Sequence, residues 1–318
     1  MKRSQPDLQV PSKAVFITGA TGFIGQHLVS TLLAHGHRVC AMIRPDKHAD
    51  SRLPQACEQA PVGLTDVNKL TAIVAESRAV IYCAGSVRGR KPENFATANI
   101  KGVKAVLDAL QRVHDASGTA PPLLLLSSLA ASRPQLSDYA QSKCEGERLL
   151  QDEPVLPWSI LRPPAVYGPG DQEMVPLLKM IRRGLLPQVG PPGQRLSLLH
   201  VDDLAAAVVS WLSAPERCLH NNYSIDDGTP GGYSWQMIGE VVSDGQFRKL
   251  ILPAFLLEIT ARTNLLLSLL LGYAPMLTPG KVRELRQPDW LCDNSDFMDA
   301  TGWKPQMDLK RGVQQLFE

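Results

Sequence analysis

A tyrosine and a lysine lie one helical turn apart at the end of "LLLLSSLAASRPQLSDYAQSK", residues 123–143. The leucine run predicts a strand buried on both faces, and "DYAQSK" predicts the start of a helix. Side chains four residues apart project from the same helix face, so Tyr139 and Lys143 would point the same way. Such a pair suits a proton-transferring tyrosine beside a cation, but this spacing also arises by chance on helix surfaces. The rest of the chain must decide between the two.

A glycine-rich loop joins the first predicted strand to the first predicted helix. In "VFITGATGFIGQHLVSTLLAHG", Gly19, Gly22 and Gly25 stand at this junction. Glycines here permit a tight turn, let the backbone approach a pyrophosphate, and let the helix pack closely on the strand. The free amides at the helix start would then face the anion. The loop therefore predicts a dinucleotide site, with a tight turn that binds nothing as the alternative.

The end of the second predicted strand, "AMIRPDK", bears on which nicotinamide cofactor is bound. Arg44 stands where an arginine suits the 2′-phosphate of NADP, and Asp46 follows two residues later. Arg44 favours NADP(H). In the alternative, Arg44 is a solvated loop cation and Asp46 meets the ribose of NAD(H).

Short apolar runs alternate with helical segments through the first half of the chain. The runs are "KAVFITG", "HRVCAMIR", "AVIYCAG", "PLLLLSS" and "WSILRPPAV". Continuous apolar strands between helices predict a parallel sheet covered on both faces, which is a doubly wound, Rossmann-type α/β fold. The second half loses this rhythm at "YGPGD", "VGPPGQ" and "DDGTPGGY". We expect a dinucleotide-binding domain over 12–165 and a smaller, irregular substrate-capping region over 166–318, partly interleaved with the first.

Composition excludes several classes of function. The net charge of +2 and the absence of long basic runs argue against nucleic-acid binding. The six cysteines show no metal-ligand spacing, so we expect no metal site and a reduced, cytoplasmic protein. The amino-terminal "MKRSQPDLQVPSK" has no apolar stretch after its basic start, so we do not expect it to be a signal peptide.

The segment 250–277, "LILPAFLLEITARTNLLLSLLLGYAPML", is very apolar. A membrane span needs about 20 apolar residues with few charges. Here Glu258 and Arg262 interrupt the segment, one turn apart and able to pair, and Asn264 follows. We therefore expect a buried or substrate-lining helix, not a span. A helix lying on the bilayer surface, with peripheral membrane contact, is the alternative.

Together, these motifs resemble the extended or atypical short-chain dehydrogenases/reductases of the NAD(P)-dependent epimerase/dehydratase kind. The resemblance runs nearly from end to end. It is carried by "TGATGFIG", "CAG", "NIKGVKAVLDA", "SS", "YAQSK", "LRPPAVYGPGD", "HVDDLAAAV" and the tail "TGWKPQMDLKRGVQQLFE".

The resemblance implies a role for each catalytic candidate. Tyr139 would exchange a proton with the substrate oxygen while hydride moves to or from the nicotinamide. Lys143, together with the positive nicotinamide ring, would lower the tyrosine pKa, and it would also hold the nicotinamide ribose. Ser128 is our choice for the residue that hydrogen-bonds the substrate oxygen, with Ser127 next and Ser132 last.

The resemblance also implies contacts with cofactor and substrate. Besides the three glycines, Arg44, Tyr139 and Lys143, the expected dinucleotide contacts lie in the loop, at strand ends and on the helix of "NIKGVKAVLDA": Thr21, Phe23, Ile24, Leu64, Ala84, Gly85, Asn99, Ser127, Pro163 and Val166. Ser86 and Tyr167 are the expected substrate contacts, with packing as an equal alternative for Tyr167. A homodimer through a helix bundle is a further implication.

Departures from the family pattern bear on the adenine contact of the cofactor and on the substrate. Gly63 stands where an adenine-contacting aspartate is common, which leaves the contact to the backbone near Leu64. Asp66 is then expected to be a helix N-cap. Sugar-nucleotide epimerases usually have an asparagine shortly after the sixth strand, where this chain reads "RPPAVYG", and an arginine at the position of Leu196; both are missing here.

Three functions remain open. The first is an NADP(H)-dependent oxidoreductase of a lipophilic alcohol or ketone, such as a sterol-like or long-chain keto compound. The second is a nucleotide-sugar epimerase or dehydratase. The third is a non-catalytic dinucleotide-binding subunit, which the Tyr139–Lys143 pair disfavours. In the first two the partner is a small-molecule substrate.

Overall fold

The computed structural model describes residues 13–318, so most of the amino-terminal segment lies outside the described residues. Its centre is a seven-stranded, wholly parallel sheet in the order β11-β6-β5-β4-β1-β2-β3. The strands are β1 (Ala14–Thr18), β2 (Val39–Ile43), β3 (Glu58–Pro61), β4 (Ser77–Tyr82), β5 (Leu123–Leu126), β6 (Trp158–Arg162) and β11 (Asn222–Ser224). The predicted doubly wound α/β fold is confirmed.

Helices cover both faces of this sheet because its strands are apolar on both sides. In β1, Val15 and Ile17 join one core and Phe16 joins the other. The first core includes residues of α1 (Phe23–Ala34), α7 (Val201–Ser213) and α11 (Ser295–Thr301). The second includes residues of α2 (Val67–Ala75), α4 (Gly102–Ser117) and α5 (Asp138–Gln151). Asp66 caps α2 by accepting a hydrogen bond from the Lys69 amide, as expected.

The second half builds a separate small core above the carboxyl ends of the strands. Its helices are α6 (Met174–Arg182), α8 (Trp235–Ser243) and α12 (Leu309–Phe317). Short parallel pairs accompany them: β7 (Ala165–Tyr167) with β10 (Leu198–His200), β8 (Leu185–Gln188) with β12 (Arg248–Ile251), and β9 (Arg195–Leu196) with β13 (Asp289–Trp290). The chain also returns to the first sheet through α7, β11 and α11.

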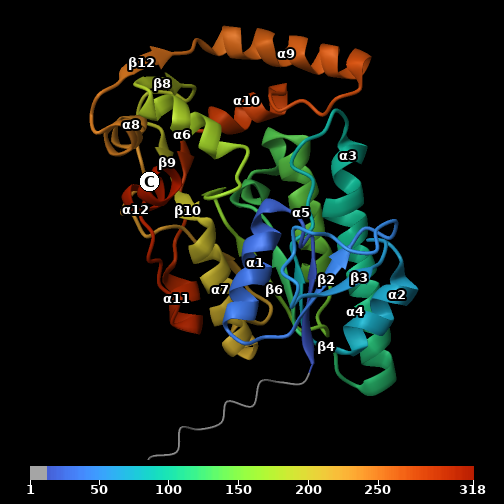
Figure 1. Ribbon diagram of the computed structural model, residues 1–318. Helices are drawn as coiled ribbons and strands as arrows, with labels where there is room; N and C mark the ends of the chain where they lie inside the picture. Colours follow the sequence, from blue (N-terminus) through green and yellow to red (C-terminus); the bar gives the residue numbers. More distant parts are fainter. Residues whose placement is uncertain (1–12) are drawn as a thin grey trace, which may run out of the picture.

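The apolar segment forms α9 (Ala254–Leu271), which lies across the top of the molecule over α10 (Pro279–Leu285) (Figure 1). Our expectation of a buried helix is wrong, because only Leu257, Ala261 and Ser268 are buried in it. Within residues 13–318, Glu258 and Arg262 form no ion pair, and Glu258 Oε2 is buried without a hydrogen-bond partner. By length and composition α9 is the one described helix that would suffice to cross a membrane, with 17% of it buried.

Candidate active site

The glycine loop lies where the strand order reverses, between β1 and its neighbours β2 and β4. Gly19 has φ +70°, and a Cβ there would lie 2.6 Å from the Ala84 amide nitrogen. A Cβ on Gly25 would overlap the Gly19 carbonyl oxygen. Gly22, by contrast, is exposed with an ordinary φ of −79°, and it begins α1 without a side-chain cap. Gly19 and Gly25 build the turn. Gly22 carries no side chain, so the outer side of the turn stays open.

This loop fits a dinucleotide. Because no side chain caps α1, the amides of its first turn remain available to an anion. Thr21, Phe23 and Ile24 are half-buried around the same turn. Arg44 is exposed at the end of β2, forms no ion pair within residues 13–318, and is followed by a turn to Lys47.

A second group of expected cofactor contacts follows the neighbouring strands. Ala84 and Gly85 follow β4, and Leu64 lies half-buried after β3. Pro163 and Val166 flank the start of β7, and the Pro163 carbonyl accepts the Leu129 amide at 2.8 Å. All of these residues lie at the carboxyl edge of the sheet, where dinucleotides bind in open α/β sheets.

Ser137 caps α5 by accepting a hydrogen bond from the Ala140 amide at 3.0 Å, which sets the first turn that carries Tyr139. One turn later, buried Lys143 donates from Nζ to the Leu126 carbonyl at 2.9 Å. A Cβ on Gly85 would lie 3.5 Å from the same Nζ. The lysine ammonium therefore lies where β4 and β5 end.

Asn99 ties these parts together from a π-helical turn, Thr97–Lys101, which the sequence pattern did not predict. Its side chain donates to Ser142 Oγ at 2.8 Å and to the Ser86 carbonyl at 3.1 Å, and it accepts the Ser86 amide at 3.0 Å. The β4 loop and α5 are thereby held to one another. Single π turns inside helices are frequent at functional sites.

Tyr139 is half-buried, and its ring packs 6.3 Å from that of Phe95. We expected Lys143 to lower its pKa. In the structure, burial raises the pKa of Tyr139, the interaction with Ser128 lowers it, and the nearby Glu284 carboxylate raises it again. The lowering expected from Lys143 together with the nicotinamide ring stays a prediction. Tyr139 therefore remains protonated at neutral pH and is better suited to donate a proton than to accept one.

The three serines after β5 have different surroundings. Ser128 lies close enough to Tyr139 to lower the pKa of the tyrosine, and its Oγ accepts the Ala130 amide at 3.2 Å. Within the described chain, the buried Ser127 hydroxyl lacks a hydrogen-bond partner, as suits a group awaiting a ligand. Ser132 is exposed and donates to the Leu129 carbonyl. Of the three, Ser128 lies with the tyrosine.

Burial lowers the pKa of Lys143 from its ordinary value of 10.5 to about 8. Between these pH values the unfolded chain binds a proton that the folded protein has released, so stability rises with pH. At about 1.4 kcal/mol per pKa unit, the rise is about 3 kcal/mol. We expect Lys143→Met to lack this rise in urea unfolding measured at several pH values, while Lys310→Met, at an exposed lysine, keeps it. Parallel pH dependence in parent and Lys143→Met would contradict the shift.

The sequence reasoning missed a contribution from α10. Gly280 packs against Ser137, since a Cβ there would lie 2.8 Å from the serine Cβ. Ser137 donates to buried Glu284, which also pairs with Lys281 at 2.9 Å. Lys281 is about half exposed, and its charge lowers the pKa of Tyr139. No local pattern marks these residues, because they lie about 140 positions after Tyr139 in the chain.

The two expected substrate contacts, Ser86 and Tyr167, have different surroundings. Ser86 is half-buried beside Asn99 and donates from Oγ to the Arg88 carbonyl. Tyr167 is fully buried against α12, where its hydroxyl donates to the Asp308 carbonyl at 3.3 Å. This placement favours packing over substrate contact for Tyr167.

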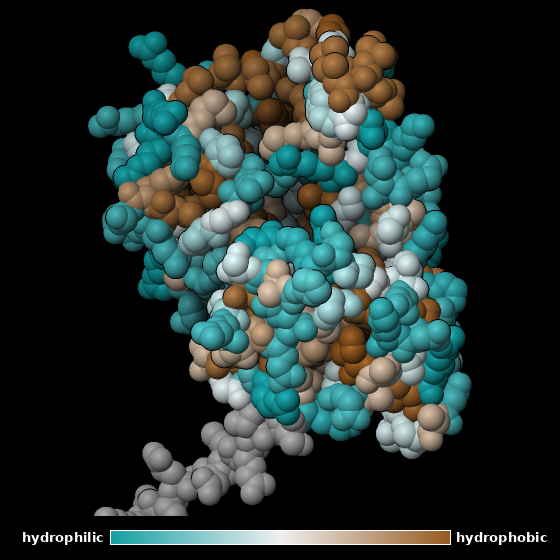
Figure 2. All heavy atoms as spheres, turned by 45° about the vertical axis from the view of Figure 1, so that its right-hand side comes forward, coloured by the Kyte–Doolittle hydropathy of each residue, from teal (hydrophilic) through white to brown (hydrophobic). Residues whose placement is uncertain are grey.

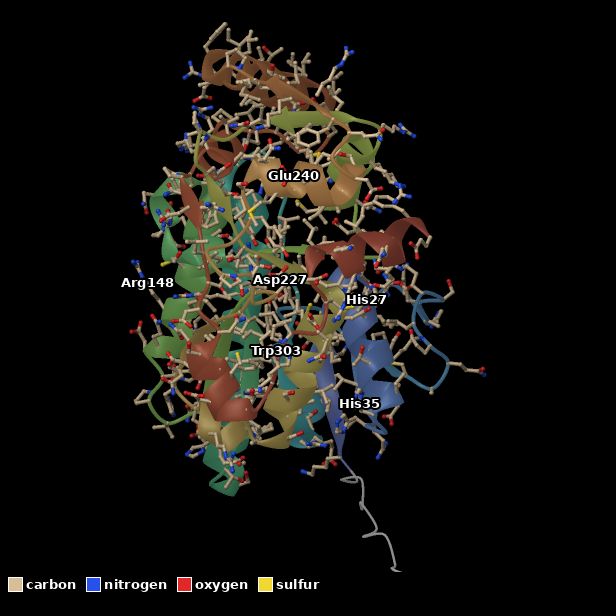
Figure 3. The ribbon with its side chains drawn as sticks, turned by 90° about the vertical axis from the view of Figure 1, so that its left-hand side faces the viewer. His27, His35, Arg148, Asp227, Glu240 and Trp303 are labelled. Atoms are coloured by element: carbon tan, nitrogen blue, oxygen red, sulfur yellow. The ribbon has the colours of Figure 1, made fainter. Side chains whose placement is uncertain are left out.

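The "HVDDLA" residues hold the second half to the sheet, as we expected. His27 of α1 contacts Asp202 at 3.0 Å, and Asp203 accepts the Gln306 and Met307 amides. Trp303, labelled with His27 in Figure 3, donates to the Asp203 carbonyl and lies between α7 and α11. His200 is wholly buried and caps α7. These residues hold the substrate-capping region in place and do not contact Tyr139.

Two surface hollows lie away from this cluster. One is lined by Gln151, Pro154, Trp158, His220 and Asn222. The other lies on the outer side of α5 between Gln135 and Arg148. Neither includes Tyr139, so the candidate site rests on the convergence of side chains at the strand ends. The described residues contain no cluster of metal-ligating side chains.

Comparisons with known proteins bear on the family of this chain. The model of the NAD dependent epimerase/dehydratase family matches residues 15–225. A ceramide reductase of Caulobacter vibrioides is 32% identical over 291 residues, covering 90% of this chain and 88% of its own. A 2-alkyl-3-oxoalkanoate reductase of Stenotrophomonas maltophilia is 25% identical, covering 95% of this chain and 98% of its own.

A solved structure shares the fold. The Thermus thermophilus UDP-glucose 4-epimerase, in complex with NAD, superposes with a TM-score of 0.67 at 19% identity, covering 95% of this chain and 97% of its own. At this identity the match supports the fold alone.

Proposed function

Because the chain belongs to the NAD-dependent epimerase/dehydratase family and is an NAD(P)-dependent oxidoreductase of the short-chain dehydrogenase/reductase type, we propose that it reduces a lipophilic ketone with NADPH. This proposal rests on one observation: Ser128, Tyr139 and Lys143 lie together at the carboxyl edge of the sheet, where the glycine loop also lies. A long-chain or sterol-like keto compound with a polar end is the substrate class.

The proposed roles follow from the contacts. The glycine loop and the amides of α1 hold the pyrophosphate, and Lys143, already beside Gly85, holds the nicotinamide ribose. Reduced nicotinamide supplies the hydride that the carbonyl carbon accepts. Ser128 hydrogen-bonds the substrate oxygen, and Tyr139 transfers its hydroxyl proton to that oxygen as the alcohol forms. The raised pKa of Tyr139 suits the direction of reduction.

Two observations favour a lipophilic substrate over a nucleotide sugar. The two reductases compared above carry names of lipid-like substrates, ceramide and 2-alkyl-3-oxoalkanoate. The asparagine and arginine typical of sugar-nucleotide epimerases are also missing, with Leu196 in the place of the arginine. The epimerase or dehydratase remains the second candidate because the fold is shared with UDP-glucose 4-epimerase.

The test compares the two substrate classes by methods suited to each. A long-chain ketone should consume NADPH, followed by its absorbance, and yield the alcohol by mass spectrometry. An epimerase consumes no cofactor overall, so UDP-sugars should be checked by NMR for a changed sugar. Conversion of a UDP-sugar without any ketone reduction would replace the proposal with the second candidate. Tyr139→Phe serves as the inactive control in both arms.

Arg44 carries the proposed preference for NADP(H). We expect NADPH to bind about ten- to a hundredfold more tightly than NADH, since a charge-assisted phosphate contact contributes roughly 1.5–3 kcal/mol. Arg44→Ala should remove most of this preference, measured by calorimetry with both cofactors. The matched variant Asp46→Ala, two residues away and also exposed, should not. Equal affinities in the parent, or loss of NADH binding in Asp46→Ala, would point to NAD(H) instead.

Cellular context and assembly also belong to the proposal. All six cysteines are free, which supports a cytoplasmic, reducing location. The resemblance to the family implies a homodimer, which light scattering would test.

A further inference from the structure

The outer surface of α9 is unusually apolar for a helix that faces solvent. Ile259, Leu266 and Leu270 are 58%, 59% and 75% exposed along its outer side. Figure 2 shows hydrophobic side chains gathered over this end of the molecule. The members of this surface, called here the α9 surface, are the exposed apolar residues of β12 and α9: Leu250, Ile251, Phe255, Leu256, Ile259, Leu266, Leu267, Leu269, Leu270 and Leu271.

Single exposed apolar residues are ordinary, but a contiguous group of this size marks an interaction site. Burying leucine-sized side chains against a partner is favourable in proportion to the apolar area removed from water. Ten such side chains in one surface would bind an apolar partner strongly. The question is which partner fits the charges around the surface.

The inner side of α9 ties the helix flat against the protein. Leu257 and Ala261 pack with Val282 of α10. Asn264 donates to the Leu277 carbonyl at 2.9 Å, and the Arg90 guanidinium donates to the Ser268 carbonyl at 3.3 Å. A helix that spanned a bilayer would have to leave all of these contacts. α9 therefore presents one side to its surroundings, as an interfacial helix does.

The charges around the α9 surface are basic. Arg248 and Lys249 are exposed in β12, and Arg262 is exposed in α9. The one acidic residue of the segment, Glu258, is only half-exposed and has a buried carboxylate oxygen. Long basic side chains can reach headgroups while their stems lie along apolar surface. Apolar side chains flanked by cations match the surface of an anionic bilayer.

The α9 surface is also close to the candidate active site. α10 packs beneath α9 through Val282, and the same short helix places Lys281 and Glu284 at the start of α5 beside Tyr139. One helix layer thus separates the α9 surface from the catalytic tyrosine.

We propose that the α9 surface docks on an anionic lipid bilayer and brings the Tyr139 site to the membrane, where a lipid ketone can enter it without crossing water. The docking follows from the exposed side chains and charges of α9 and β12. It does not depend on the substrate proposed above, so each can fail alone.

Sedimentation with vesicles tests the docking. The intact protein should sediment with vesicles of mixed phosphatidylcholine and phosphatidylglycerol, more weakly with phosphatidylcholine alone, and less as salt rises. The double variant Leu266→Asp/Leu270→Asp should bind at least tenfold more weakly. Arg248→Gln/Lys249→Gln should lower binding to the anionic vesicles and flatten the salt dependence. The matched control is Val155→Asp, which changes an equally exposed apolar residue in the loop after α5 and should bind as the parent does.

Folding is checked independently, because every variant should keep the parent's NADPH affinity and melting temperature within a few degrees. The proposal is overturned if the parent fails to sediment with any vesicle. It is also overturned if light scattering shows a dimer that the double aspartate variant disrupts while vesicles bind neither protein, since the α9 surface would then join two copies. Vesicle binding without ketone reduction would contradict the substrate proposal and still support the docking proposal.

Discussion

Tyr139→Phe is expected to fold and to bind NADPH as the parent does, and to reduce a ketone substrate about 10² to 10⁴ times more slowly. The change removes one hydroxyl and keeps the ring that packs beside Phe95. The lost contribution is that of a positioned general acid whose pKa is raised by burial. Steady-state kinetics give the loss in kcat, and calorimetry gives the cofactor affinity.

Three further variants separate chemistry from folding. Tyr223→Phe removes a hydroxyl from another buried tyrosine, on β11, and should leave turnover unchanged. Ser128→Ala should lower turnover, whereas Ser132→Ala should not, because Ser128 affects the pKa of Tyr139 while Ser132 donates to the Leu129 carbonyl. Lys143→Met should weaken both turnover and NADPH binding. Full turnover in Tyr139→Phe would mean that the "DYAQSK" pair is a coincidence of helix surface.

Gly22→Val is expected to abolish dinucleotide binding, with a loss of at least about a hundredfold in affinity, or about 3 kcal/mol. Gly22 is the loop glycine to change because its φ of −79° suits any residue. A Cβ there lies 3.3 Å from the Gly19 carbonyl oxygen, which the loop can absorb by a small shift. The isopropyl group would then stand in the space that the pyrophosphate needs.

The matched control is Ser30→Val, at an exposed position of the same helix, which should bind the cofactor normally. Circular dichroism should show native helix content in both variants. Gly19 and Gly25 are unsuitable for this test, since side chains there meet the backbone of the loop itself. Parent-like NADPH affinity in folded Gly22→Val would show that the phosphates bind elsewhere.

Local patterns predicted the central strands and the glycine loop well. The strands β1, β4 and β5 are buried on both faces, so their sequences are continuous apolar runs that are easily read. Edge strand β3 was not read from periodicity because "EQAP" is half-exposed and has no apolar alternation. The π turn that carries Asn99 also has no compositional mark, because it differs from an α-helix only in its hydrogen bonds.

The sequence by itself determined the family, the parallel sheet, the dinucleotide loop, and the helical turn that joins Tyr139 to Lys143, because each depends on residues close together in the chain. Only the tertiary structure decided which serine meets Tyr139, that burial raises the pKa of this tyrosine, and that Lys281 and Glu284 lie beside it. Those facts depend on contacts between distant segments and on the exclusion of water. The exposure of α9 was likewise decided only by the tertiary structure. The same apolar composition suits a buried helix and a helix on a bilayer surface, and only the packing shows which side of the helix is free.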